Sequence, residues 1–171
     1  MRSSGSRSSR RRLHGRAGLF FVLLIALAAQ GCGPRFVKGT EIEYSAERQA
    51  LADVVERYRL AMVQRDGDTL QAMASKGYFE NGSTTSDPSD DYNYQGLMKV
   101  LGDLKQEVRA VRYDIQIQGI EIYGDTATVD YEYEAQYQFA VGDQDRWANK
   151  TDKNRLTFRR EAGDWRIITG M

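Results

Sequence analysis

Histidine and cysteine are nearly absent from this chain, whose 171 residues include one of each, His14 and Cys32. A lone cysteine has no partner within the chain, which excludes a scaffold held by internal disulfides. Only two prolines are present, which excludes a collagen-like composition. The longest apolar run covers 17–29, and it is shorter than the ~20 residues that a membrane-spanning helix needs. A polytopic membrane protein is therefore excluded as well.

Acidic residues are missing from the first 31 positions, which contain six arginines. The apolar run at 17–29 follows this basic segment, an order that is typical of a secretory signal peptide. A buried core helix is the alternative, which six arginines without acidic neighbours disfavour. Arg10-Arg11-Arg12 partly matches a twin-arginine export motif, and an ordinary basic segment explains it equally. We predict a signal peptide over 1–31 and leave its export route open.

The segment that follows, Ala28-Ala29-Gln30-Gly31-Cys32, resembles the bacterial lipobox. In that pattern the cysteine is acylated and becomes the new N-terminus, and its acyl chains hold the protein at a membrane by burying CH₂ groups, at ~0.8 kcal/mol each. The resemblance implies a lipoprotein of the bacterial cell envelope, with Cys32 and a tether over 32–45, that faces the periplasm. Gly33 stands where many inner-membrane lipoproteins have Asp, which favours the outer membrane. A free thiol at Cys32 is the alternative.

Cleavage before Cys32 would leave a mature chain with no histidine and no free thiol. The commonest general base, the usual zinc ligand and the cysteine nucleophile would then all be missing. We therefore expect no catalytic site, no metal site and no cofactor. Residues 32–171 keep 18 of the 24 basic residues and all 24 acidic ones, a net charge of −6. That sign argues against nucleic acid as a partner, because phosphate binding needs a basic surface.

The first half of the mature chain has the apolar spacing of helices. Ser45 is a candidate N-cap for a helix that ends at Asp66-Gly67, where Gly67 would adopt the left-handed conformation. Asp68 is expected to cap a shorter second helix. A polar loop over 81–91 precedes a third helix, whose apolar positions begin at Leu97.

The second half alternates apolar and polar residues with a period of two, which predicts strands. Expected strands cover 111–122 and 127–138, with a bulge at Gly119 and a hairpin turn over Tyr123-Gly124-Asp125-Thr126. Two more follow, over 147–158 and 165–169. Three N-terminal helices followed by an antiparallel meander predict an α+β domain with the helices on one face of a curved sheet.

Several motifs resemble those of the nuclear transport factor 2-like superfamily, in its SnoaL-like branches. They are Val55-Glu-Arg-Tyr58, Arg65-Asp-Gly-Asp-Thr-Leu70, Ile120-Glu-Ile-Tyr-Gly-Asp-Thr-Ala-Thr-Val129 and Leu156-Thr-Phe-Arg-Arg-Glu-Ala-Gly-Asp-Trp-Arg-Ile167. The resemblance covers about 46–171 and implies a cone in which helices cover the sheet and can leave a pocket. It does not imply one function, because the superfamily contains isomerases, cyclases, dehydratases and non-catalytic binding modules, which are often dimeric.

The apolar register of the predicted sheet contains no acid. Its acids fall on the opposite face, where cross-strand pairs with arginines are expected: Asp114, Asp130, Glu132 and Glu134 with Arg112, Arg155, Arg159 and Arg166. Aromatic residues dominate the apolar register and could line a ligand pocket: Tyr113, Tyr131, Tyr133 and Tyr137, with Trp147 nearby. The alternative is that these rings fill the core.

Two functions stay open on the sequence. The first is a membrane-anchored, non-catalytic module that binds a small hydrophobic ligand, a second copy of itself or another envelope protein. The second is an isomerase- or dehydratase-type enzyme that would use an inward tyrosine with Asp152 or Glu56. Asn154 is then the candidate hydrogen-bonding group, although the register of its strand is not fixed by the sequence.

Overall fold

The computed structural model describes residues 35–82, 88–142 and 144–171. The chain divides into two units, 1–34 and 35–171, and the described residues belong to the second. The predicted signal peptide and Cys32 lie outside the described residues. Within them, no helix is both long enough and apolar enough to cross a membrane. The described residues of the unit 35–171 contain a continuous hydrophobic core of their own.

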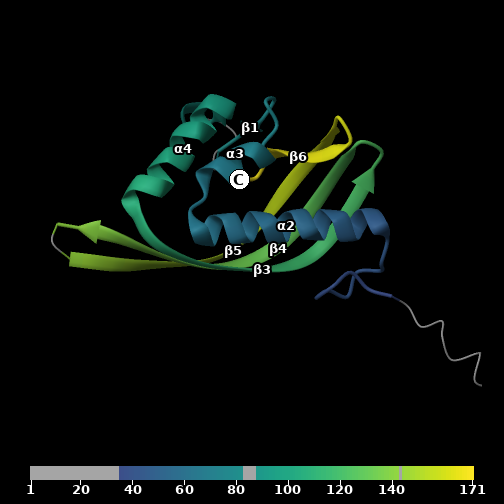
Figure 1. The fold of residues 1–171 in the computed structure, drawn as a ribbon, viewed down its shortest axis with the longest axis horizontal. Helices are drawn as coiled ribbons and strands as arrows, with labels where there is room; N and C mark the ends of the chain where they lie inside the picture. The colour runs from purple at the N-terminus through teal and green to yellow at the C-terminus, as the bar shows by residue number, and fades with distance from the viewer. Residues whose placement is uncertain (1–34, 83–87, 143) are drawn as a thin grey trace, which may run out of the picture. The chain divides into compact units, whose positions relative to one another are not determined.

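The described unit is an α+β domain, as the sequence predicted (Figure 1). Its helices are α2 (Ala46–Gln64), α3 (Gly67–Met73) and α4 (Tyr94–Glu107), and they lie on the concave side of a curved sheet. The sheet has the antiparallel order β3-β4-β5-β6, with bounds Val108–Tyr123, Thr126–Val141, Gln144–Glu161 and Asp164–Thr169. Between α3 and α4, the short strands β1 (Phe79–Glu80) and β2 (Tyr92–Asn93) pair with each other, and a 3₁₀ turn covers Pro88–Asp90.

The start of α2 follows the prediction, whereas its end differs by two residues. Ser45 caps the helix by accepting a hydrogen bond from the N–H of Arg48 at 3.1 Å. The left-handed residue is Arg65, with φ of 53°, and not Gly67, which is the first residue of α3. The cap of α3 is Asp66 instead of Asp68. Only two residues separate the helices, so the chain must turn at Arg65 and begin the next helix at once.

The sheet register confirms the predicted turn and bulge. A register shift lies between Ile117 and Gly119, and β3 and β4 are joined by a turn in which Gly124 has φ of 60°. The pairing of β4 with β5 is continuous and places Asn154 opposite Tyr131 and Asp152 opposite Tyr133. Both side chains therefore belong to the inner face, which the sequence alone left undecided.

The last residues of the chain close one end of the domain. Glu80 accepts hydrogen bonds from the hydroxyl of Thr169 at 3.0 Å and from the N–H of Gly170 at 2.6 Å. Gly170 has φ of 99°, and a Cβ there would lie 2.0 Å from the carbonyl oxygen of Arg155. Only glycine allows this approach. The outer edge of β5 is thus covered at Arg155.

The N-cap of α3 gives a test of the local structure. The carboxylate of Asp66 accepts hydrogen bonds from the N–H and hydroxyl of Thr69, which lower the pKa of Asp66. Asp66→Ala should lower the melting temperature by a few degrees at neutral pH, whereas Asp68→Ala should leave it nearly unchanged. Because the pKa of Asp66 is lowered in the folded state, this stabilisation is complete at pH values above the ordinary pKa of an Asp side chain. It is lost as the pH falls through the lowered pKa of the folded state. The difference between wild type and Asp66→Ala should therefore shrink in strong acid. Equal melting temperatures for Asp66→Ala and wild type at neutral pH would contradict the assignment.

Candidate functional site

Four tyrosines from three elements pack together between α2 and the sheet. Tyr58 comes from α2, Tyr113 from β3, and Tyr131 and Tyr133 from β4. Their exposed fractions are 3%, 4%, 1% and 9%, in that order. Tyr58 meets Tyr113 edge to face with ring centroids 6.1 Å apart, and Tyr133 lies 5.4 Å from Tyr113 and 6.1 Å from Tyr131. We call these four residues the tyrosine cluster.

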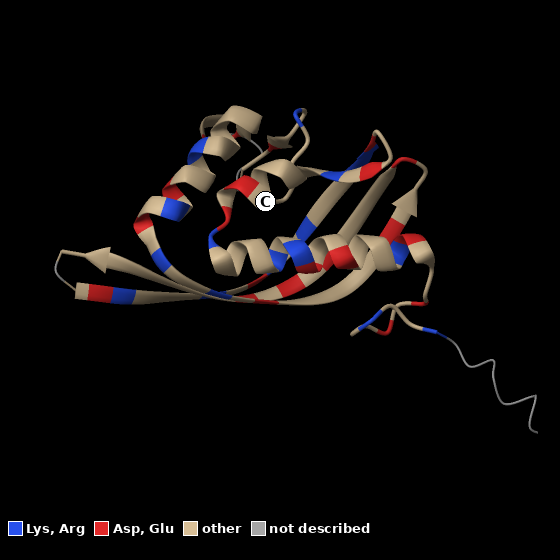
Figure 2. Ribbon diagram, in the orientation of Figure 1, with Lys and Arg blue, Asp and Glu red and all other residues tan. Residues whose placement is uncertain are grey.

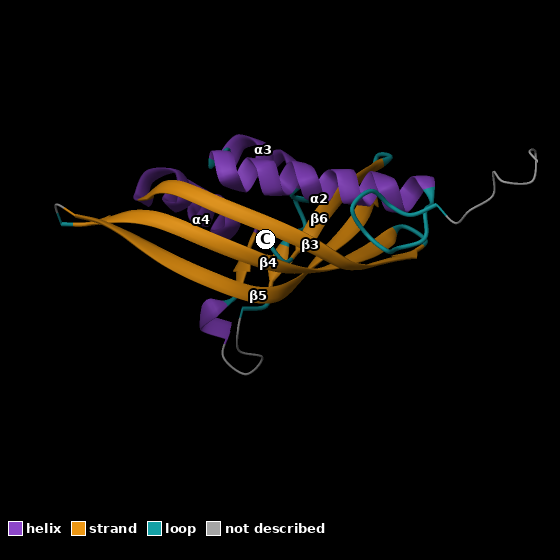
Figure 3. Cartoon of the chain, turned by 90° about the horizontal axis from the view of Figure 1, so that it is seen from below, coloured by secondary structure: helices purple, strands orange, loops and turns teal. Residues whose placement is uncertain are grey.

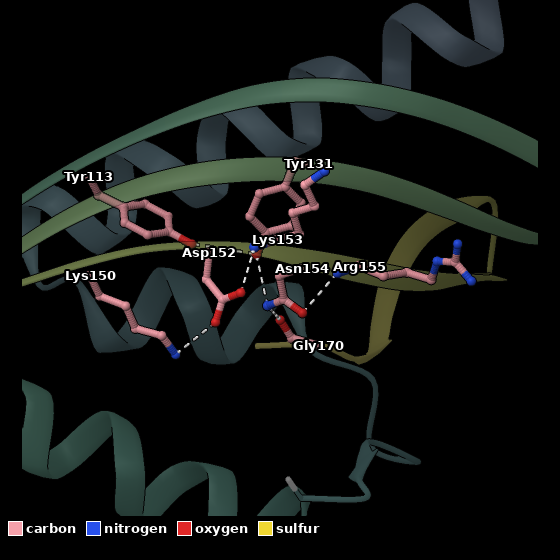
Figure 4. A network of polar contacts seen from close by, with 8 residues as sticks. All are labelled: Tyr113, Tyr131, Lys150, Asp152, Lys153, Asn154, Arg155 and Gly170. Carbon is pink, nitrogen blue, oxygen red and sulfur yellow. Dashed lines mark hydrogen bonds and ion pairs between the residues drawn. The ribbon is translucent and has the colours of Figure 1, made fainter.

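The buried hydroxyls of the tyrosine cluster have partners within the chain. The hydroxyl oxygens of Tyr113 and Tyr131 lie 3.5 Å apart and share a hydrogen bond. The side-chain amide of Asn154 donates to the hydroxyl of Tyr131 at 3.1 Å and to the carbonyl of Gly170 at 3.0 Å (Figure 4). Asn154 therefore connects the tyrosine cluster to the closed end of the domain.

Burial also fixes the charge state of these phenols. Desolvation raises the pKa of Tyr58 and Tyr113 well above the ordinary value near 10, and it also raises the pKa of Tyr131. The three phenols are thus neutral at physiological pH and unsuited to act as bases there. Because Tyr113 and Tyr131 bond to each other, their hydroxyls form part of the core.

Two of the five predicted pocket residues lie outside the tyrosine cluster. Tyr137 is on the same face of β4 but only partly buried. Trp147 pairs with Gln138, which places it on the opposite, polar face of the sheet. There it is 48% exposed, and the guanidinium of Arg112 lies 5.5 Å from its ring. The structure does not bring Trp147 together with the tyrosines, because the residue lies one position out of their register.

The two acids of the enzyme hypothesis, Asp152 and Glu56, are exposed side chains that lie beside basic residues. Asp152 lies 3.5 Å from the ammonium of Lys150 and accepts from the N–H of Lys153 at 2.8 Å, and its side chain is 54% exposed (Figure 4). Glu56 is paired with Arg59 at 2.7 Å, which lowers its pKa. An acid that abstracts protons near neutral pH needs the opposite environment, an apolar site that raises its pKa.

The outer face of the sheet bears charge pairs across strands, but of the predicted partners only Asp130 and Arg155 pair with each other, since Arg159 and Arg166 lie against Glu161 and Asp164. Arg155 bonds to Asp130 at 2.6 Å, and Lys153 lies 3.0 Å from Glu132. These side chains are largely exposed, so each pair contributes little stability. The face is solvated and well balanced in charge.

Two hollows of the described domain lie away from the tyrosine cluster, and a third, of about 530 Å³, has Tyr131 and Asn154 in its wall. One of about 530 Å³ lies between α2, α3 and β6, with Arg57, Met73 and Trp165 in its wall. Another of about 350 Å³ lies between α2, β3 and the segment at 38–40, beside Val55 and Ile115. Neither was expected from the sequence, because each wall combines segments that are far apart in the chain.

The most exposed part of the sheet is the first two-thirds of β5. All residues from Gln144 to Arg155 are exposed, on both faces of the strand, whereas Leu156 and Phe158 are fully buried. β6 pairs with β5 only from Thr157 onward. The segment 144–155 is thus held by β4 alone. We call this segment the arm of β5; Figure 1 shows the start of β5, with the end of β4, extending beyond α4.

Comparison with known proteins identifies the fold. No family model and no curated protein matches the sequence. A nuclear transport factor 2-like superfamily protein from Salmonella enterica serovar Typhimurium matches with a TM-score of 0.61 and 12% identity, over 72% of this chain and 87% of that chain. A protein assigned as a dehydratase of the nuclear transport factor 2-like family, from Streptomyces avermitilis, matches with a TM-score of 0.60 and 11% identity, over 72% and 92%. A hexachlorocyclohexane dehydrochlorinase matches with a TM-score of 0.58 and 12% identity, over 73% and 82%.

The domain therefore has the nuclear transport factor 2-like fold, as the sequence motifs indicated. Identities this low establish the fold and leave the function to the residues of this chain.

The tyrosine cluster predicts how the domain responds to alkali. Burial raises the pKa values of Tyr58, Tyr113 and Tyr131 above those of the unfolded chain. The stabilisation is therefore complete below pH ~10 and is lost as the pH rises further, by about 1.4 kcal/mol per pH unit for each of these phenols that stays neutral. Tyr113→Phe should therefore weaken the pH dependence of unfolding above pH ~10, measured by urea titration. The control Tyr44→Phe changes a tyrosine that is 43% exposed and should leave the slope unchanged. Equal slopes for wild type and Tyr113→Phe would show that Tyr113 is not buried as described.

Proposed function

We propose that this chain is a non-catalytic binding module of the cell envelope, anchored through lipid on Cys32, that recognises a protein partner with the arm of β5. The observation that carries the proposal is a contrast within one sheet. The tyrosine cluster occupies the inner face under α2, whereas the segment 144–155 is exposed on both faces. A strand that its own domain leaves uncovered suits an intermolecular contact better than a structural role.

Small-ligand binding inside the cone is less well supported. The rings of Tyr113, Tyr131 and Tyr133 contact one another, and the hydroxyls of the first two are bonded within the chain. A ligand there would have to displace packed rings and break hydrogen bonds that are costly to leave unmade in the interior. We therefore propose that these tyrosines fill the core.

Closure of the interior can be tested with 8-anilinonaphthalene-1-sulfonate, a flat aromatic anion that fluoresces on apolar surfaces. The native unit 35–171 should give no saturable fluorescence at neutral pH, and a partly unfolded acid sample serves as the positive control. Saturable binding to the native unit that Tyr137→Ala abolishes and Tyr44→Ala retains would contradict the proposal and support an open pocket.

Catalysis is the second candidate function, and one feature favours it. Asp152 and Lys150 lie beside Tyr133 on the inner face, and similar folds include the dehydrochlorinase and the assigned dehydratase. An elimination would need Asp152 to act as a base, although its carboxylate is exposed and paired. Any turnover found for the purified chain should then disappear in Asp152→Asn and persist in Glu132→Gln, whose carboxylate is on the outer face.

Membrane attachment has its own prediction. The full chain, expressed in a bacterium, should sediment with membranes and have the mass of a form that is acylated at Cys32, because several acyl chains together anchor a protein stably. Cys32→Ser should abolish acylation and release the chain from membranes or leave it unprocessed. The control Gly33→Ala should still be acylated. A wild-type mature chain without lipid would contradict the anchor and leave the fold unaffected.

A further inference from the structure

We propose that the free edge of β5 pairs with the same edge of a second copy, antiparallel and centred on Asn149, so that two sheets join into one. This inference rests on the proposed function, since it names the partner that the arm recognises. Three features of the strand support it: the open backbone groups of its edge, the two ends that bound this open edge, and the order of charges along the strand.

The two edges of the sheet are treated differently by the rest of the chain. β3 forms one edge, and α2 lies alongside it (Figure 3). The guanidinium of Arg59 donates to the carbonyl of Tyr113 at 3.2 Å, and that of Arg65 donates to the carbonyl of Val108. Side chains of α2 thus occupy carbonyls that an added strand would need. The segment 144–155 of β5, at the opposite side of the sheet, is not paired to β6.

The direction of the backbone groups along β5 follows from two hydrogen bonds. The N–H groups of Lys153 and Arg155 bond to the side chains of Asp152 and Asn154, each at 2.8 Å, and so point away from β4. Backbone groups of alternate residues in a strand point to alternate sides. Because the β4–β5 register is continuous, the N–H and C=O groups of Trp147, Asn149 and Thr151 also point to the open edge.

The open edge has two natural limits. At one end, the chain turns after Val141, and β5 begins at Gln144, which pairs with Val141. At the other end Gly170 lies against the carbonyl of Arg155 and closes the edge. The outward-pointing backbone groups between these limits belong to residues 145–153, of which the N–H of Lys153 is bonded to the side chain of Asp152. The midpoint of this span is Asn149. A second copy of this strand, related by a two-fold axis through Asn149, fills the opening along its whole length.

The charges of this segment fit that register. Pairing about Asn149 places Arg146 opposite the partner copy's Asp152, and Asp145 opposite the partner copy's Lys153. Asp145 and Lys153 already have partners within the chain, Arg109 at 2.8 Å and Glu132 at 3.0 Å. Asp152 has a longer contact, 3.5 Å to Lys150, so its pair with Arg146 of the second copy is the more selective. Figure 2 shows the adjacent acidic and basic residues at the start of β5.

Neighbouring registers place like charges together. A shift of the centre to Ala148 puts Arg146 opposite Lys150, and a shift to Lys150 puts that residue opposite itself. Like charges directly across a strand pair are destabilising, and opposite charges are stabilising. Charged residues on an edge strand usually discourage pairing, but here their order permits one antiparallel register with a second copy.

Sedimentation velocity of the unit 35–171 over a concentration series tests the pairing. The wild type should shift from monomer to dimer. Asn149→Pro removes an N–H that the β4–β5 ladder does not use, so the domain should stay folded and become monomeric, whereas Asn149→Ala should still dimerise. Arg146→Asp should weaken the dimer by at least ~10-fold, since two sites per dimer become repulsive. The double variant Arg146→Asp with Asp152→Arg should restore it to within ~3-fold.

Disulfide trapping reads the register directly. The unit 35–171 has no cysteine, and the Cα atoms of directly paired antiparallel residues lie ~5.5 Å apart, within disulfide range. Asn149→Cys should therefore form a covalent dimer on mild oxidation, and Ala148→Cys should not. A wild type that stays monomeric at every concentration would overturn the self-pairing and leave the binding module standing. A dimer that persists in Asn149→Pro and fails to crosslink at position 149 would also overturn it, because its contact must lie on another surface.

Discussion

The fold depends on placing several phenol groups in a dry interior without leaving their hydroxyls unbonded. A buried hydroxyl without a partner costs free energy comparable to that of a lost hydrogen bond, so the packing around Tyr131 must supply partners as well as volume. Tyr113 supplies one and Asn154 the other, at 3.5 and 3.1 Å. Asn154 comes from an exposed stretch of β5 and also holds Gly170, and Glu80 holds Gly170 from the other side. This chain of contacts joins α2, the sheet and the final residues into one core.

The same arrangement divides the sheet into two parts with different surroundings. Beneath α2 and α3 the inner face is closed by rings, and the acids that a cone-type enzyme would use are outside in solvent, paired with Lys150 or Arg59. The arm of β5 is exposed on both faces, and its edge is open up to Arg155. In our proposal, recognition depends on the backbone groups and charges of this arm. The fold of this domain, in our proposal, presents the exposed segment 144–155 of β5 to a partner, and its interior does not form a catalytic pocket.

Much of this architecture was predictable from the sequence, and the exceptions have physical causes. The period of two fixed the inward face of β3 and β4, since a shift of one residue would have exposed Val129 and Tyr131. Gly119 and Gly124 marked the bulge and the turn correctly.

The cap of α3 was predicted at Asp68 instead of Asp66, because a two-residue connection between helices leaves several acids eligible for the same role. Trp147 was grouped with the tyrosines because its register depends on the long-range pairing of β4 with β5, which composition does not encode. Tyr58 belonged to a motif within the first predicted helix, but its contact with Tyr113 joins segments too distant in sequence to be inferred from spacing.

The most direct test of the central claim, that recognition takes place at the open edge of β5, is amide hydrogen exchange measured residue by residue by NMR at increasing protein concentration. The amides of Ala148 and Lys150, which bond to β4, should be protected at every concentration. Those of Trp147, Asn149 and Thr151 should exchange fast in dilute solution and gain protection as the concentration rises. Constant fast exchange at these three amides, in a protein whose Tyr131 amide remains protected, would contradict the claim.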